Sequence, residues 1–145
     1  MIKQTFFVTT AVLALFSSGC SMADTVTAIS PVNEHVKPVD AATASADVAA
    51  LDAEVTAFLR GRYTIESASY YHFAGEIPWV AIAKSVQNQM REKSIERVVF
   101  DWNNPGYDFV EVYPQGKSAF AVAMYTKSSR SKQKLVGYFV LSAAR

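Results

Sequence analysis

The stretch Ser118-Ala-Phe-Ala-Val-Ala-Met-Tyr-Thr126 decides the fold, because it is apolar at nearly every position. Side chains of a β-strand point alternately to the two faces of a sheet, so Phe120, Val122 and Met124 lie opposite the alanines between them. The stretch from Leu135 to Leu141 is apolar on both faces too. Strands of this kind are usually covered on both sides. The sequence predicts a sheet whose second face is either covered by a helix or left open for a partner.

Two amphipathic helices are predicted before these strands. The first runs from Ala46 to Arg60, with Ser45 as N-cap and Gly61 just beyond its end. The second follows Pro78 and has the clearest apolar stripe in the chain. The stripes consist of Val48, Leu51, Val55, Phe58 and Leu59 in the first helix, and of Trp79, Ile82, Ala83, Val86 and Met90 in the second.

Five strands complete the domain. Tyr63 to Phe73 alternates with Tyr63, Ile65, Tyr71 and Phe73 on one face, and separates the two helices. The other four follow the second helix: 96–102, 107–113, 118–126 and 135–141, with turns at Asn103–Gly106 and Pro114–Gly116. The order α-β-α-β-β-β-β predicts an α+β fold, an antiparallel meander sheet packed by one or two helices. This order resembles cystatin-like folds in outline, a likeness of topology that implies no function.

The N-terminal segment contains an address signal. Lys3 precedes an uncharged, mostly apolar run from Phe6 to Phe16, which is too short for a spanning helix. The run ends in Phe16-Ser17-Ser18-Gly19-Cys20-Ser21, which contains the only cysteine. It resembles the lipobox of bacterial lipoproteins, although Ser17 stands where that family usually has Leu. The resemblance implies a signal peptide over 1–19, acylation of Cys20 (palmitate among the chains) and, from Ser21, an outer-membrane position facing the periplasm. The alternative is an ordinary secretory signal cut near Ala23.

The mature chain divides into a flexible tether over 20–44, attached to the membrane by its lipid, and one domain over 45–145. In the tether, Thr, Ala, Ser, Val and two prolines alternate with isolated charges, without a lasting helical or strand period. As a taut chain it would reach about 80 Å. The net charge of +1 conceals an uneven distribution, with six acidic residues and Lys37 between Asp24 and Glu54, and twelve basic and seven acidic residues from Arg60 onward.

The sequence assembles no catalytic constellation, so we do not expect an enzyme, a cofactor or a metal. His72 is the only histidine of the predicted domain, and a surface position is favoured over a role as catalytic base. Asp101, Asp108 and Glu111 surround a turn but lack the spacing of a calcium loop. With Cys20 acylated, no thiol remains for catalysis.

Two surfaces are candidates for partner binding. The basic loop from Lys127 to Lys134 would meet an anionic envelope polymer or an acidic protein, or is simply a solvated hairpin tip. Nucleic acid is a poor fit for an exported chain. An aromatic face would hold a protein partner, unless the first helix covers it. The candidate residues are Lys127, Arg130, Lys132 and Lys134 in the loop, and Tyr107, Phe109 and Tyr113 on the face.

These features favour a non-enzymatic outer-membrane lipoprotein, a protein-binding accessory that docks on an envelope-spanning assembly such as a secretion system, a pilus or a conjugation machine. The alternative is a periplasmic inhibitor or immunity-type lipoprotein. The third reading is a small envelope hydrolase.

Overall fold

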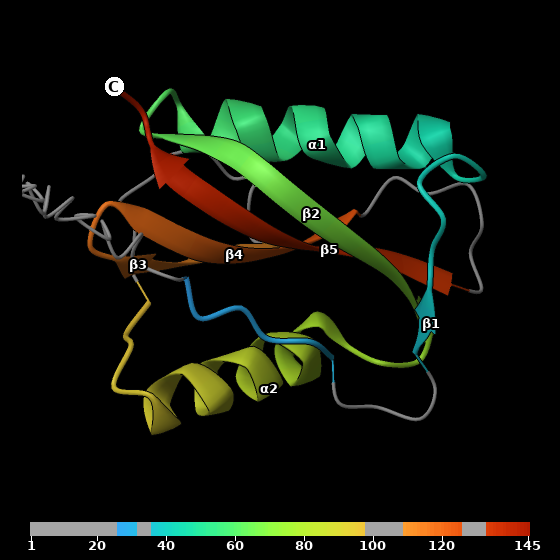
Figure 1. Cartoon of the computed structure of the whole chain (residues 1–145). Coiled ribbons are helices and arrows are strands. Elements are labelled where there is room, and N and C mark those ends of the chain that lie inside the picture. The colour runs from blue at the N-terminus through green and yellow to red at the C-terminus, as the bar shows by residue number, and fades with distance from the viewer. Residues whose placement is uncertain (1–25, 32–35, 98–108, 126–132) are drawn as a thin grey trace, which may run out of the picture.

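A computed structural model describes residues 26–31, 36–97, 109–125 and 133–145. Its elements are β1 (Lys37–Pro38), α1 (Ser45–Leu59), β2 (Tyr63–Ala74), α2 (Trp79–Glu92), β3 (Val110–Gln115), β4 (Ser118–Tyr125) and β5 (Gln133–Ala143). The strands form one antiparallel sheet in the order β1-β2-β5-β4-β3 (Figure 1). The predicted α+β class, an antiparallel sheet packed by two helices, is confirmed.

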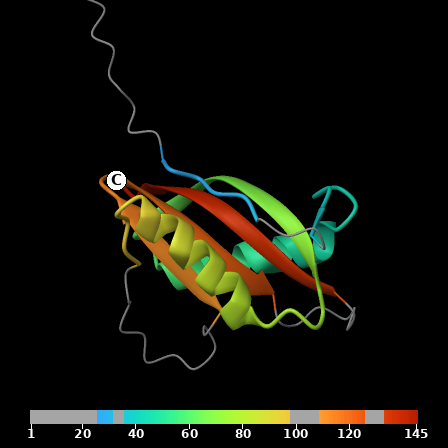
Figure 2. The ribbon, with the colours of Figure 1, turned by 90° about the horizontal axis from the view of Figure 1, so that it is seen from below.

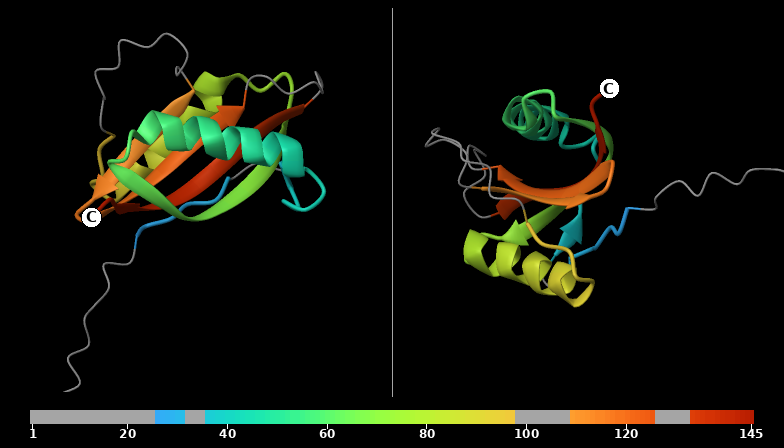
Figure 3. Two further views of the ribbon diagram at one scale, coloured as in Figure 1. Left: turned by 90° about the horizontal axis from the view of Figure 1, so that it is seen from above. Right: turned by 90° about the vertical axis from the view of Figure 1, so that its left-hand side faces the viewer.

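Strand β4 lies near the middle of the sheet and separates two cores. Its alanines belong to the cluster beneath α1, and Phe120, Val122 and Met124 belong to the cluster beneath α2. The right-hand view of Figure 3 shows the three layers, with a helix on each side of the sheet. Of the two alternatives that the sequence leaves open, the structure has the covered one, and each helix covers one face of the strand.

Helix α1 buries the five apolar residues predicted for it. Its N-cap is Ala44, without a side-chain cap bond, so the prediction of Ser45 as N-cap is wrong by one residue. The preceding turn is held by Asp40, whose carboxylate accepts a hydrogen bond from the amide of Ala42 at 3.0 Å. Arg60 (φ 48°) and Gly61 (φ 72°) then turn the chain back toward β2.

Strand β2 contains a bulge between Ile65 and Ser67, opposite β5. Before the bulge, Tyr63 and Ile65 pack on the α1 side. The extra residue shifts the alternation by one, so that Tyr71 and Phe73 pack on the α2 side. The predicted single face holding all four of these residues is therefore wrong, because the bulge divides it between the two cores.

The structured part of the chain begins earlier than residue 45. Thr27 and Gln115 exchange two hydrogen bonds: the Thr27 amide donates to Oε1 at 2.7 Å, and Nε2 donates to the Thr27 carbonyl at 3.1 Å. Ile29 is buried in the core beneath α2, and β1 pairs with β2 through Lys37 and Pro38. Figure 2 shows residues 26–31 (blue) beside α2. Much of the stretch predicted as tether is therefore packed on the domain.

The remaining predictions concern the connection from α2 to β3. Residues 95–97 are not in a strand, and the rest of the strand predicted over 96–102 lies outside the described residues, as does the turn at 103–106. Strand β3 begins at Val110. A turn follows β3 as predicted, but it lies at 116–117, with Gly116 at φ 65°; Pro114 and Gln115, predicted in the turn, are the last residues of β3.

Candidate functional surfaces

The predicted aromatic face does not present Tyr113 to solvent. The ring of Tyr113 is fully buried in the core beneath α2, and its hydroxyl donates to Glu111 at 2.6 Å. Burial and this hydrogen bond raise the pKa of Tyr113 far above its ordinary value of 10. Phe109 is half-buried, with its ring centroid 6.1 Å from that of Trp79, and Tyr107 lies outside the described residues. This side of the sheet is therefore closed, by α2 and not by the first helix.

The predicted basic loop falls mostly outside the described residues, including Lys127, Arg130 and Lys132. Lys134 is described, and it stands in β5. Its Nζ donates to the carbonyl of Ile77 at 2.6 Å. Lys134 therefore ties β5 to the turn before α2.

The other polar candidates lie apart from one another. His72 is in β2, opposite Lys37 of β1. Glu111 forms an ion pair with Arg97 at 2.9 Å, while Cys20, Asp101 and Asp108 lie outside the described residues. Within the part of the chain that the structure describes, no three His, Cys, Asp or Glu side chains are placed to hold a metal ion.

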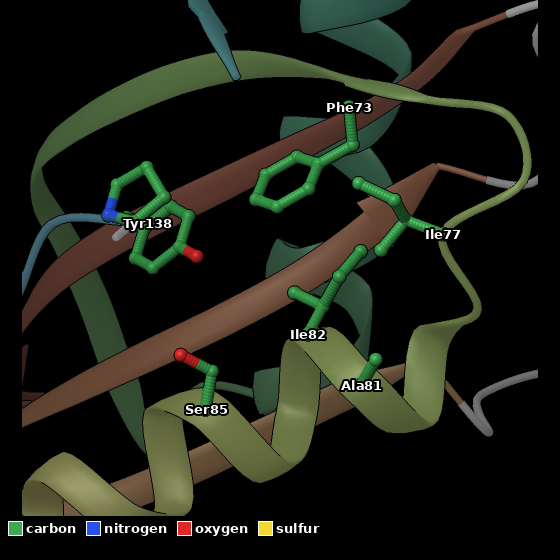
Figure 4. A pocket seen from close by; sticks show the side chains of 7 residues that line it. Phe73, Ile77, Ala81, Ile82, Ser85 and Tyr138 are labelled. Atoms are coloured by element: carbon green, nitrogen blue, oxygen red, sulfur yellow. The ribbon is translucent and has the colours of Figure 1, made fainter. Parts of the chain in front are cut away.

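A small pocket of about 80 Å³ opens between the first half of α2 and the sheet (Figure 4). Its walls are mainly apolar, with the hydroxyls of Ser85 and Tyr138 as polar groups. Burial raises the pKa of Tyr138 well above its ordinary value, so this hydroxyl stays neutral. Sites for small molecules are usually about 300 to 1,000 Å³, so the pocket is suited to one apolar side chain. It is lined by Pro31, Phe73, Ile77, Ala81, Ile82, Ser85 and Tyr138.

Basic residues gather at the opposite end of the sheet, which we call the basic end: Arg60, Arg62, Lys117 and Arg145, all exposed. The carbonyl of Lys117 accepts from the amide of Ala143 at 2.7 Å, and that of Arg62 accepts from the amide of Ala144 at 2.9 Å. Figure 1 shows this end on the left, with the C-terminus and the end of α1.

The basic end is not among the surfaces predicted from the sequence, because Arg62 and Arg145 are 83 residues apart in the chain. The signal was present in two turns, Arg60-Gly61-Arg62 and Gly116-Lys117, where a basic residue follows a glycine. In an antiparallel sheet, the start of β2 and the start of β4 lie at the same end as the end of β5. Tracing strand directions would have brought these residues together.

Within the described residues, no helix has both the length and the apolar character that a membrane crossing requires. Comparisons of the chain with protein-family models, with curated proteins and with solved structures gave no match, so the likeness to cystatin folds stays a prediction.

Proposed function

We propose that the protein is an outer-membrane lipoprotein, anchored through an acylated Cys20, whose domain acts as a non-enzymatic docking module for an envelope-spanning assembly of the secretion, pilus or conjugation type. The lipobox-like segment from Phe16 to Ser21 supports the anchor. The partner would be another envelope protein.

The observation that carries this proposal is the attachment of Thr27 to Gln115. It leaves only the five residues 21–25 between the acylated cysteine and the described domain, a span of about 20 Å when extended. A lipid at Cys20 would therefore hold the basic end toward the membrane. The opposite end, which carries the start of α2 and the turn before it, would face the periplasm (Figure 1).

The periplasm-facing end offers apolar contact area for a protein partner. Val80 is 71% exposed in the first turn of α2, and the next residue in the chain, Ala81, lines the small pocket. An apolar side chain of the partner would enter the pocket and cover Val80. Fully buried anchors of this kind dominate the affinity of many interfaces.

The anchor is tested by the mass of the mature N-terminus. An acylated chain beginning at Cys20 is expected, and Cys20→Ser should move the protein from the membrane fraction to the soluble one. An unmodified chain that begins after Ala23 would refute the anchor.

The docking end is tested by placing a photo-crosslinking amino acid at Ala81, with Ala49 of α1 as the matched control. Both alanines are exposed and helical, but Ala49 lies on the other side of the sheet. We expect one discrete adduct from position 81 and none from 49, and the loss of that adduct when Val80→Asp is added. Equal crosslinking from both positions would show that α2 is not the docking surface.

A further inference from the structure

The basic end is formed by three neighbouring strands and the helix beside them. The end of β5, residues 143–145, lies between Arg62, which precedes β2, and Lys117, which precedes β4. The backbone amides of Ala143 and Ala144 donate hydrogen bonds to the carbonyls of Lys117 and Arg62, and so join the three segments. Neighbouring strands are about 4.8 Å apart, so the backbones of Arg62 and Lys117 are about 10 Å apart. Arg60 ends α1 two residues before Arg62. Four cationic side chains therefore project from a narrow region.

The acidic residue nearest to this region along β2 is Glu66. Its carboxylate accepts a hydrogen bond from the hydroxyl of Ser142, which holds it against β5. Arg60, Arg62, Lys117 and Arg145 are all exposed, so these four basic residues can contact an anionic surface at this end of the sheet.

The N-terminal segment leaves the domain at the same end. Gln115, which holds Thr27, is separated from Lys117 only by Gly116. A lipid attached at Cys20 is then confined to within about 20 Å of the point where the described chain begins. Four cations placed there face whatever surface the lipid enters.

We propose that the basic end binds the anionic phospholipid headgroups of the membrane that holds the lipid. The headgroup contact fixes the orientation of the domain, and so presents the first turn of α2 to the periplasm. The inference rests on the proposed function for the anchor, but the affinity of the basic end for anionic lipid is a separate property of the folded domain.

The expected size of the effect follows from the number of charges. Each Lys or Arg near an anionic surface strengthens binding by about fivefold, which corresponds to about 1 kcal/mol. Removing two of them should lower the contact equilibrium by about thirtyfold. The attraction decays over a Debye length of about 8 Å at physiological ionic strength, so about 1 M salt should abolish it.

The test uses the acylated protein reconstituted into vesicles of phosphatidylcholine alone, or with one third phosphatidylglycerol. Acylation blocks Cys20, so Ala144→Cys introduces the only free thiol for an environment-sensitive fluorophore. Ala42→Cys, in the turn before α1, is the matched control, because both alanines are exposed and neither change alters a charge. We expect a blue shift of the label at 144 with phosphatidylglycerol, reversed by 1 M salt, and little change at 42.

The charges are tested by adding Arg62→Gln and Lys117→Gln to the label at 144. Lys37→Gln with Lys84→Gln, two exposed lysines away from the basic end, gives the same change in net charge. Loss of the blue shift in the first pair alone is expected. An equal loss in both pairs, or the same signal in the two vesicle types, would overturn the proposal.

Failure of the anchor gives a different result. If the N-terminal mass shows no acyl chain, the labelled protein is instead added to preformed vesicles with Cys20→Ser. Salt-sensitive cosedimentation with phosphatidylglycerol that needs Arg62 and Lys117 would then support the lipid contact, although the lipoprotein proposal fails. Absence of cosedimentation would refute the lipid contact as well as the lipoprotein proposal.

Discussion

Gly137→Ala should destabilise the domain, although alanine is normally the better residue in a strand. Gly137 lies in β5, paired with Tyr70 of β2. A Cβ atom at this position would lie 2.5 Å from Cε2 and from Cζ of Phe139, and 3.2 Å from Cδ2 of Leu51 in α1. The ring of Phe139 therefore occupies the space that a side chain at position 137 would fill.

The magnitude is the difference between two effects. Phe139 is fully buried, with its ring centroid 6.1 Å from that of Tyr70 in an edge-to-face contact, so it has no free space to enter. Relieving the overlap requires a ring movement of about 1 Å, and overpacking of this kind costs about 1 to 3 kcal/mol. Replacing glycine in a strand returns about 0.5 to 1 kcal/mol. The middle values of these two ranges differ by about 1 kcal/mol, which is the expected net loss.

Urea unfolding followed by circular dichroism measures this loss as a lower midpoint at unchanged slope. Adding Phe139→Leu to Gly137→Ala removes the ring that meets the new methyl group, so the double variant should lose less than the two single losses added together. An unchanged or raised midpoint in Gly137→Ala would refute the proposed close contact.

Two further predictions concern buried polar groups. Burial raises the pKa of Tyr70, Tyr113 and Tyr138 above 10. Above pH 10 the unfolded chain therefore loses these protons before the folded chain does, and the free energy of unfolding should fall as pH rises. A constant free energy of unfolding between pH 10 and 11.5, measured with urea, would contradict this. Gln115→Ala removes both hydrogen bonds to Thr27, so it should lower the free energy of unfolding by about 1 to 3 kcal/mol and expose residues 26–31 to limited proteolysis. The control Gln89→Ala on α2 should do neither. Equal protection of 26–31 in the two variants would argue against the attachment.

The layers of the fold could be predicted from the sequence because the signal is local and periodic. The stripe of α1 and the alternation of Phe120, Val122 and Met124 with alanines each fix a direction for every side chain. Periodicity does not say which helix covers which face, because the stripes of α1 and α2 suit either side. For that reason the sequence offers the first helix as one possible cover over Tyr113, whereas the structure places α2 there.

The bulge in β2 and the packing of residues 26–31 could not be predicted in the same way. Neither glycine nor proline marks the bulge at Glu66, and its effect appears only as a change of face further along the strand. Thr27 and Ile29 lie in a stretch without a lasting period, and their partners are contributed by segments much later in the chain. Contacts that depend on such distant partners leave little trace in local sequence. The basic end was missed for the same reason.

The alternating strand β4 has an evolutionary consequence. Its backbone separates the alanine side, against α1, from the side of Phe120, Val122 and Met124, against α2. Side chains that do not touch and share no partners contribute nearly additively to stability, so a change in one core seldom needs compensation in the other. The surface carried by α2 is thus free to diverge while the core beneath α1 is unchanged.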